Sequence, residues 1–328
     1  MNTKATPTVT VILPSYNSAI RYIAETMETI VNQTYQDFEV LVVNDGSTND
    51  TPDWVNQLSQ KEPKVRMVSQ ANQGLAGARS TGVKNARGKY IAFIDDDDLW
   101  ESTKLAKQVA SLESNPEAGL CYTWTALADS EGNATGRVIA SFAEGDVWKQ
   151  MTEMNIVCCG STPMIRRSCF DDVGLFSRDV SPSDDWDMWW RISAKYPFTL
   201  VKEPLIRYRQ HPNNSSKKCE HMLETTRILI ERNFANAPTE LLHYRNRSYG
   251  CIYLYLGWRA IENQDYQQAE EFRNRAIAHR PQLRFSAKSI RLKIAILMQR
   301  WLGADVYDRA KAVIFSLRRR GIKAVDRS

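Results

Sequence analysis

Residues 90–100, YIAFIDDDDLW, join a short apolar segment directly to four consecutive carboxylates. The apolar part predicts a β-strand that is buried on both faces. Like charges this close repel one another and raise each other's pKa values unless a cation neutralises them. At the carboxyl end of a parallel strand, where α/β folds bind ligands, such a cluster suits a divalent metal. A solvated acidic turn is the alternative, and the upstream sequence decides between the two.

Strands alternate with helices before this segment. β-Branched runs predict strands at 8–13, 38–43 and 65–68, and apolar residues at helical spacing predict a helix at 20–31 and another after residue 73. This alternation is typical of βαβ units. The sequence therefore predicts an α/β fold with a mostly parallel sheet and helices on both faces.

Polar turns follow three of these strands, at Pro14–Asn17, Asn44–Ser47 and Asp95–Asp98. The carboxyl ends of parallel strands meet at one edge of the sheet, so the three turns should line one crevice. Each is an ordinary turn sequence taken alone. Their convergence favours an enzyme site.

Downstream, a helix is predicted from Trp100 to about residue 114, a strand at 119–125 and a turn at 129–133. Asn155–Ile165 is apolar and rich in small residues. Ser183–Arg191 resembles a helix start with acidic residues in its first turn, which helix capping alone would also explain.

Composition excludes several classes of protein. With 328 residues, 43% hydrophobic and 25% charged, the chain is long enough for a large domain and a smaller one and is not disordered. We expect no membrane span. Its six cysteines show no metal-ligand spacing, which predicts reduced thiols and a cytoplasmic protein.

From about residue 216 onward the pattern is helical only. The spacing of Tyr253, Leu256, Gly257, Ala269 and Ala276 matches much of one tetratricopeptide helix pair. Beyond it, residues 284–328 carry twelve Lys and Arg against three Asp, whereas the rest of the chain is net negative.

This basic tail carries two apolar stripes. The stripes are Ile290, Ile294, Leu297 and Trp301, then Ala310, Val313, Ile314 and Leu317. They predict either packing on the preceding helices, the usual fate of such stripes, or peripheral contact with an anionic membrane on its cytoplasmic face. Nucleic-acid binding is not expected, because no aromatic residues are interleaved at base-stacking spacing.

Six motifs in order resemble those of the family 2 glycosyltransferases, which are inverting nucleotide-sugar enzymes of the GT-A fold. They are VILPSYN at 11–17, VNDGST at 43–48, NQGLAGAR at 72–79, FIDDDD at 93–98, SDDWDMW at 183–189 and RYRQH at 207–211. The resemblance covers about residues 8–215. It implies a Rossmann-like GT-A catalytic domain at 1–215, followed by an all-α region at 216–328.

The resemblance also implies how a nucleotide would bind. Asp45 would accept hydrogen bonds from the base, Pro14 and Tyr16 would pack against it, and Asn17 belongs to the same turn. Arg79, at a helix start, would add positive charge near the diphosphate. The donor would be a UDP-sugar by preference, with GDP- and dTDP-sugars as alternatives.

By the same resemblance, Asp97 and His211 would ligate Mn²⁺ or Mg²⁺, while Asp95 and Asp96 hold ribose or the metal shell. Asp185 would remove the proton of the acceptor hydroxyl as its oxygen attacks the anomeric carbon. A single displacement inverts the configuration and needs no second catalytic carboxylate.

Two points stay open in the sequence. The family's acid pair is usually Glu-Asp and is Asp-Asp here, so Asp184 or Asp187 would be the next candidates for the base. The acceptor is expected to be a glycan or a lipid-linked glycan of surface polysaccharide or glycolipid synthesis, with specificity set by Leu127–Gly160.

Two other functions were weighed. A sugar nucleotidyltransferase would need a Gly-rich phosphate loop, and residues 14–17 contain no glycine. A non-catalytic nucleotide-binding or interaction protein would not need Asp97, Asp185 and His211 together.

Overall fold

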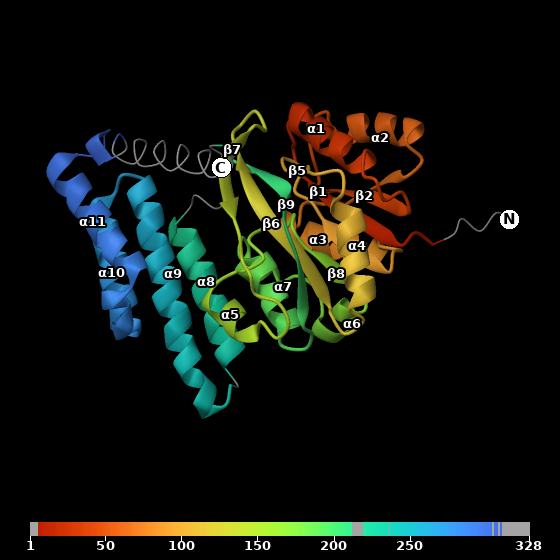
Figure 1. Ribbon diagram of the computed structural model, residues 1–328. Helices are drawn as coiled ribbons and strands as arrows, with labels where there is room; N and C mark the ends of the chain where they lie inside the picture. Colours follow the sequence, from red (N-terminus) through yellow and green to blue (C-terminus); the bar gives the residue numbers. More distant parts are fainter. Residues whose placement is uncertain (1–5, 212–218, 236, 304, 308, 310–328) are drawn as a thin grey trace, which may run out of the picture. The chain divides into compact units, whose positions relative to one another are not determined.

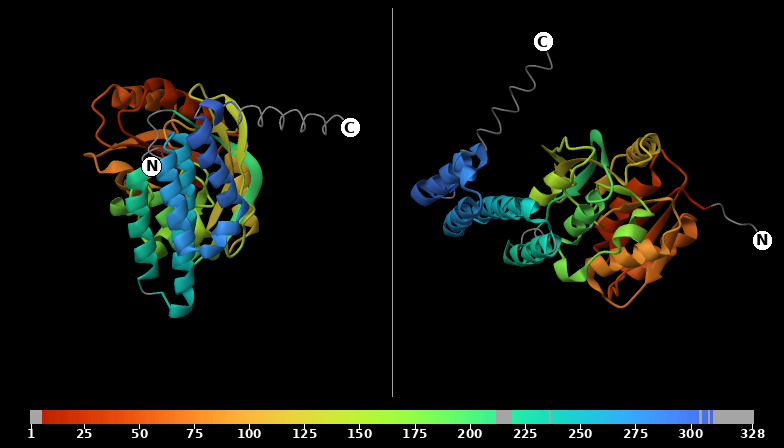
Figure 2. Two further views of the ribbon diagram at one scale, coloured as in Figure 1. Left: turned by 90° about the vertical axis from the view of Figure 1, so that its left-hand side faces the viewer. Right: turned by 90° about the horizontal axis from the view of Figure 1, so that it is seen from below.

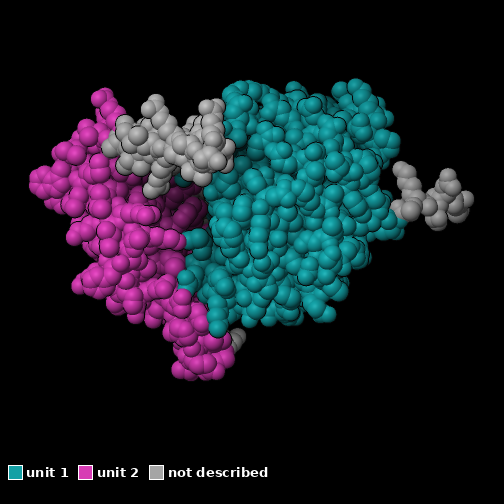
Figure 3. Space-filling model, in the orientation of Figure 1, with its two compact units in different colours: residues 1–216 teal, residues 217–328 magenta. Residues whose placement is uncertain are grey.

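A computed structural model of the chain describes residues 6–211, 219–235, 237–303, 305–307 and 309. The chain divides into two compact units, residues 1–216 and 217–328 (Figure 3). The first unit contains a mixed α/β fold, and the described part of the second is helical (Figure 1).

The first unit is built on a sheet whose strands lie in the order β3-β2-β1-β4-β8-β6-β9-β5, with β7 beside β6. The strands are β1 (Val9–Ser15), β2 (Phe38–Asn44), β3 (Val65–Ser69), β4 (Tyr90–Phe93), β5 (Leu99–Trp100), β6 (Leu120–Ala128), β7 (Ala134–Ile139), β8 (Met164–Arg166) and β9 (Phe198–Arg209). Strands β1 to β4 pair in parallel, and so do β6 and β9. Because β8 lies between β4 and β6 and is antiparallel to both, β4 and β6 run in the same direction. Six strands therefore share one direction: β1, β2, β3, β4, β6 and β9. The predicted mostly parallel sheet is confirmed.

Helices cover both faces of this sheet. They are α1 (Ile20–Val31), α2 (Thr51–Lys61), α3 (Gly74–Asn85), α4 (Lys104–Ser114), α5 (Trp148–Glu153), α6 (Cys169–Val173) and α7 (Asp184–Ser193), with the 3₁₀ turn η1 (Arg178–Val180). Val9, Val11 and Leu13 of β1 belong to one buried cluster with residues of α1, α2 and α4. On the other face α3 lies so close that a Cβ at Gly82 would overlap the Ile12 side chain. Apolar residues on both sides of the strands therefore bury the sheet completely.

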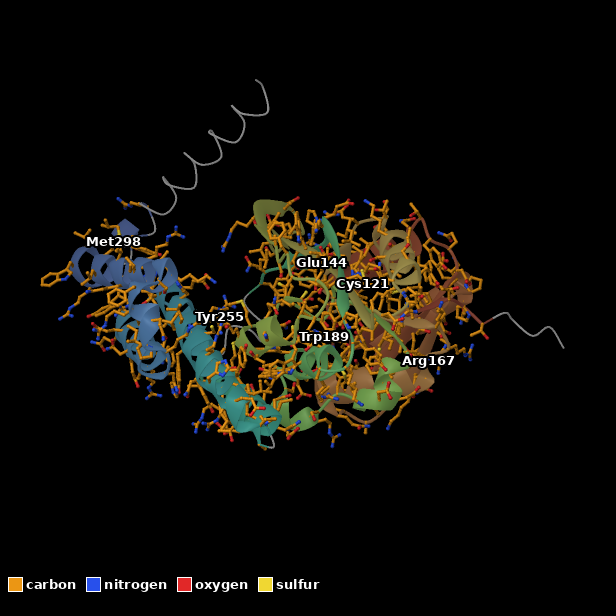
Figure 4. All side chains as sticks on the ribbon, turned by 60° about the horizontal axis from the view of Figure 1, so that its bottom comes forward. Cys121, Glu144, Arg167, Trp189, Tyr255 and Met298 are labelled. Atoms are coloured by element: carbon orange, nitrogen blue, oxygen red, sulfur yellow. The ribbon has the colours of Figure 1, made fainter. Side chains whose placement is uncertain are left out.

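The second face also holds an aromatic cluster. Phe93 of β4 packs edge-on against Phe170 and Phe176, and its ring lies 6.3 Å from that of Trp189 on α7. Figure 4 marks Trp189 within the first unit. This packing fixes the position of α7 relative to the strand that precedes the four carboxylates.

The structure corrects one predicted element and adds two strands that were not predicted. Leu99–Trp100 forms the short strand β5 against β9, so the helix predicted from Trp100 begins at Lys104. Residues 198–209 form one continuous strand, β9, which includes the first three residues of the RYRQH motif. In the apolar stretch 155–165, only the last residues enter the sheet, as part of β8. Pairing across the sheet, which the local pattern does not report, sets all three strands.

Helices α8 to α11 form the described part of the second unit (Figure 2). They are α8 (Cys219–Phe234), α9 (Leu242–Glu262), α10 (Tyr266–His279) and α11 (Ala287–Leu302), with the turns η3 (Thr239–Leu241) and η4 (Pro281–Phe285). Tyr253, Leu256, Ala269 and Ala276 are buried where α9 and α10 pack together. A Cβ at Gly257 would lie 2.7 Å from the Leu292 side chain, so this glycine lets α11 approach α9.

The two apolar stripes of the tail have different outcomes. Ile290, Ile294, Leu297 and Trp301 lie on α11 and are exposed, so the expectation that this stripe packs on the preceding helices is wrong. The buried face of α11 is the opposite one, with Leu292, Ala295 and Ile296. The second stripe lies outside the described residues. Among the helices that are described, none has both the length and the apolar character needed to cross a membrane.

Candidate active site

A cavity of about 490 Å³ lies where the carboxyl ends of β1, β2 and β4 meet. Its size suits a small-molecule ligand. It is lined by Pro14, Ser15, Tyr16, Asp45, Asn72, Gly74, Leu75, Ala78, Asp95, Asp96, Asp97, Tyr208 and His211. Of the predicted site residues, Pro14, Tyr16, Asp45, Asp95, Asp96, Asp97 and His211 are in this lining. Asn17, Arg79 and Asp185 are not.

Asp97 and His211 meet at this cavity although 114 residues separate them. The Oδ2 atom of Asp97 lies 2.7 Å from Nε2 of His211. Asp97 comes from the turn after β4, and His211 from just beyond the end of β9. The His211 ring also stacks on Tyr22 of α1, with centroids 5.6 Å apart. A carboxylate and an imidazole are thus held side by side at the edge of the cavity.

A buried arginine holds the acidic turn in place. Arg209 is fully buried; its Nε donates to the Asp97 carbonyl oxygen at 2.8 Å, and its backbone N–H donates to Asp98 Oδ1 at 3.1 Å. Asp98, also fully buried, accepts a second hydrogen bond from the Ser161 hydroxyl. The backbone N–H of Asp95 donates to that same hydroxyl at 3.0 Å. Asp98 therefore has a structural role, whereas Asp95, Asp96 and Asp97 line the cavity.

Crowding in this turn disfavours the charged form of its carboxylates. Burial and the neighbouring Asp97 and Asp95 raise the pKa of Asp96 to about 7, although a hydrogen bond from Ser18 opposes the rise. Burial and Asp95 likewise raise the pKa of Asp97, against the effect of His211. A cation bound here would relieve the repulsion.

Asp45 and Asn17 have different surroundings. Asp45 Oδ1 accepts hydrogen bonds from Gln70 Nε2 at 2.6 Å and from the Gln73 backbone N–H at 2.9 Å, which fixes its carboxylate beside the cavity. Asn17 instead uses its side-chain oxygen to accept a 2.8 Å hydrogen bond from the Thr48 N–H. It has a positive φ of 50°, which asparagine tolerates better than most residues. Asn17 thus ties the β1 and β2 turns together rather than facing the cavity.

Arg79 is buried between two acidic residues from distant parts of the chain. Its guanidinium lies 2.8 Å from Asp95 Oδ1 and 2.9 Å from Asp184 Oδ2. Gly160 leaves room for it, because a Cβ there would overlap the guanidinium. Arg79 is thus separated from the cavity by Asp95, and its role of adding positive charge near the diphosphate stays a prediction. It connects the acidic turn to the first turn of α7.

The three acidic residues of α7 are not equivalent. Asp184 and Asp187 are fully buried, and each lies within 3 Å of an arginine, Arg79 and Arg191 respectively. Asp185 is half-buried and accepts from its neighbouring backbone N–H at 2.6 Å. Burial raises its pKa to about 7, with Arg79 opposing and Asp184 adding to the rise. Asp185 is therefore the one member of this trio that is not fully buried, and its raised pKa suits a base near neutral pH.

Several residues of this site were not assigned from the sequence. Ser161, Arg209 and Ser18 support the acidic turn through buried or partly buried hydrogen bonds. Ser161 lies in the small-residue stretch noted at 155–165, and Arg209 in the RYRQH motif. The small-residue stretch and the RYRQH motif can both be recognised in the sequence, but neither pattern shows which distant group the side chain contacts.

The donor set is compatible with a hard divalent cation without forming a complete metal cage. Among the described side chains, no group of three His, Cys, Asp or Glu residues converges closely enough to hold a metal alone. Mg²⁺ sites commonly take one or two carboxylates together with substrate phosphates, and neutral imidazole is a common metal ligand. Asp97 and His211 fit such an incomplete site.

The family model described as "Glycosyl transferase family 2" matches residues 10–174, half of the chain. The match runs from β1 to α6 and includes the turns after β1, β2 and β4 that line the cavity.

Similar proteins carry consistent descriptions. An uncharacterized glycosyltransferase of Haemophilus influenzae is 28% identical over 237 residues, which cover 69% of this chain and 72% of that protein. One from Rickettsia bellii is 30% identical over 208 residues, covering 63% of this chain and 29% of its own length. Chondroitin synthase of Escherichia coli is 28% identical over 215 residues, covering 66% of this chain and 31% of the synthase. The chain thus spans less than a third of the last two relatives.

Two solved structures share the fold. A mannosyltransferase from Pyrobaculum calidifontis, in complex with GDP-Man and Mn²⁺, has a TM-score of 0.59 at 18% identity, covering 91% of this chain and 88% of that one. TarS from S. aureus, in complex with UDP-GlcNAc, has a TM-score of 0.53 at 15% identity, covering 83% and 88%. At these identities the likeness shows the GT-A-like fold.

Proposed function

The chain belongs to glycosyl transferase family 2 and is thereby a nucleotide-sugar glycosyltransferase; on this premise we propose that it moves a sugar from a nucleoside diphosphate to an acceptor hydroxyl with inversion at the anomeric carbon. The contact between Asp97 and His211, 2.7 Å apart at the cavity, is the observation that carries this proposal. A sugar nucleotidyltransferase is excluded by family membership.

The donor nucleotide would lie in the cavity at the ends of β1 and β2. The fixed carboxylate of Asp45 would accept hydrogen bonds from the base, and Pro14 and Tyr16 would pack on its faces. Tyr16 exposes 53% of its surface beside the cavity, as a ring that stacks on a ligand would. UDP is the preferred nucleotide, with GDP and dTDP as alternatives.

Asp97 and His211 would hold Mn²⁺ or Mg²⁺, with Asp95 and Asp96 beside them for the ribose or the metal's outer ligands. When bound, the ion would neutralise charge on the departing diphosphate. The raised pKa values of Asp96 and Asp97 support this assignment, because burial and then carboxylate repulsion raise them, and a bound cation would stabilise the charged form against both.

Asp185 would act as the general base. The acceptor oxygen attacks the anomeric carbon, the bond from that carbon to the diphosphate oxygen breaks, and the hydroxyl proton passes to Asp185. Arg79 would position this base, because it joins Asp184, the neighbour of Asp185, to Asp95 in the acidic turn. The supporting observation is that Asp184 and Asp187 are fully buried beside arginines.

The acceptor is proposed to be a glycan or a lipid-linked glycan in surface polysaccharide or glycolipid synthesis, and the compartment the cytoplasm. Leu127–Gly160 is proposed to set acceptor specificity. This segment includes β7, all of whose residues are exposed, and Phe142, which is 68% exposed and packs edge-on against Trp124. Exposed aromatic surface of this kind suits a sugar ring.

A thermal-shift screen tests the donor assignment. UDP, GDP and dTDP and their sugars would each be added with Mn²⁺, with Mn²⁺ alone and nucleotide alone as references. A ligand at a hundred times its dissociation constant stabilises the protein by about 2.7 kcal/mol. The nucleotide sugar that stabilises the protein in this screen would then be incubated with candidate acceptors, and NMR of the product would report the anomeric configuration. Retention of configuration would overturn the inverting mechanism.

A further inference from the structure

Helix α11 has two apolar faces, and one of them is uncovered. Leu292, Ala295 and Ile296 are buried within the second unit. On the opposite side, large apolar residues remain 41–74% exposed. They are Ile290, Ile294, Leu297 and Trp301. At 100° per residue these four fall within about 60° of one another around the helix axis, so they form a single stripe. We call it the outer stripe.

Exposed apolar residues also lie at both ends of the helix. Phe285 precedes α11 and is 80% exposed, and Leu302 follows Trp301 at 56%. A large aromatic residue therefore stands near each end. Figure 4 shows the side chains of α11, where Met298 is labelled. An apolar strip this long is unusual on a surface that faces only water.

The charges on helix α11 itself have one sign. Between residues 284 and 303 there are five Lys and Arg and no Asp or Glu. Arg291 projects about 90° from the centre of the stripe on one side, and Lys293 and Arg300 about 70–90° on the other. Arg300 lies 3.9 Å from Glu270 of α10, a weak exposed pair. The sequence after residue 309 is also basic, with six Lys and Arg against one Asp.

We propose that the outer stripe of α11 docks on the surface of an anionic lipid bilayer, with the helix lying in the headgroup plane. The apolar stripe would enter the boundary between headgroups and acyl chains, and the flanking cations would reach lipid phosphates. Trp301 and Phe285 are residue types suited to that boundary. The sequence alone indicated membrane contact somewhere in the basic tail, residues 284–328. The exposed position of the outer stripe on α11 limits the proposed membrane contact to residues 285–302.

Charge complementarity distinguishes this occupant from a second copy of the chain. A symmetric contact through the outer stripe would bring the cations of one α11 against those of the other without any acid from that helix to pair them. An anionic bilayer provides the opposite charge along the whole helix. The proposal does not depend on the catalytic assignments, since no residue of the cavity takes part.

Vesicle co-sedimentation of the full-length protein tests the proposal. Vesicles of phosphatidylcholine alone would be compared with equal parts of phosphatidylcholine and phosphatidylglycerol, at low and at high salt. We expect binding to the mixed vesicles that weakens with salt. The triple variant Ile294→Gln, Leu297→Gln, Trp301→Gln should bind roughly 100-fold more weakly or worse, because three large apolar side chains no longer leave water. Lys293→Gln should weaken binding roughly fivefold.

Leu242→Gln is the matched control, because Leu242 lies on α9 and has the same 41% exposure as Leu297. It should bind like the unaltered protein, and all variants should keep its melting temperature. Failure of the unaltered protein to bind mixed vesicles would overturn the proposal, as would unchanged binding by the triple variant. A dimer in gel filtration that the triple variant dissociates, without vesicle binding, would assign the stripe to a second copy instead.

Discussion

The residues around the cavity of the first unit and those of helix α11 of the second depart from the usual pattern of burial in opposite ways. Around the cavity, charged side chains such as Arg79, Asp98 and Arg209 are buried and paired, while the apolar residues of the sheet are hidden. On α11 the cations are exposed, and so are Ile294 and Trp301. Buried charge costs free energy unless it is paired, and exposed apolar area costs it unless something covers it. Both departures from the usual pattern therefore mark places where we expect ligands.

The largest effect should come from the acidic turn. Asp97→Ala removes half of the Asp97–His211 pair, and transfer should fall by roughly 10³-fold or more. Folding should persist, because this carboxylate belongs to a turn and not to the apolar core. A donor turnover assay with titrated Mn²⁺ measures the loss, and Asp53→Asn on the exposed face of α2 is the control. Full activity of the unaltered protein in excess chelator would contradict the metal assignment.

Asp185→Asn should slow transfer by ~10²–10⁴-fold while donor binding persists. The change removes a proton acceptor but keeps nearly the same shape. Single-turnover rates and nucleotide thermal shifts separate the two effects. Should the variant transfer sugar at the original rate, the base would lie elsewhere on the cavity wall.

Arg79→Met leaves Asp95 and Asp184 without their shared cation. Removing one partner of a buried ion pair costs about 3–5 kcal/mol, so the melting temperature should drop and activity should fall with it. Arg87→Met is the control, because Arg87 is 62% exposed and lies 3.9 Å from Glu39. Although Glu39 is buried, this pair is long and its cation is exposed, so we expect it to contribute no more than about 1 kcal/mol. Equal losses from the two variants would contradict the positioning role of Arg79.

The two faces of α11 should respond differently to the same change. Ile296→Ala should destabilise the second unit by about 2–5 kcal/mol, because Ile296 is 2% exposed. Ile294→Ala, two residues away and 52% exposed, should change stability by no more than about 0.5 kcal/mol. Hydrogen exchange of α11 amides measures both. Similar losses would show that the outer stripe is covered by protein.

The smallest effect is a pH dependence of about tenfold per unit. The pKa of Asp185 is raised to about 7, so the ionised base becomes scarcer as pH falls below 7, and kcat/KM should decline there and level off above 8. Asp185→Asn should lack this slope. Because the folded-state pKa lies above the unfolded value, the native state binds the extra proton, and stability should rise as pH falls from 7 toward 4. A flat profile from pH 5 to 8 would contradict the role of Asp185.

Local sequence was sufficient for the order of strands and helices in the first unit up to β4. Because both faces of this sheet are buried, its strands are continuous apolar runs, and the helices that cover it show apolar residues at a period of 3.6. Both patterns can be recognised in the sequence. It was insufficient at Leu99–Trp100, where pairing with β9, about a hundred residues later, makes a strand of a predicted helix start.

The sequence by itself determined which residue types gather at the cavity, because parallel strands bring their carboxyl ends to one edge whatever the detail of their packing. Only the tertiary structure decided the partners. It placed Arg79 between Asp95 and Asp184, turned Asn17 toward Thr48, buried Asp98 against Ser161 and left Asp185 half-exposed. It also decided which side of α11 faces solvent. The physical reason is that burial and ion pairing are properties of the space around a side chain, and that space is filled by residues far away in the sequence.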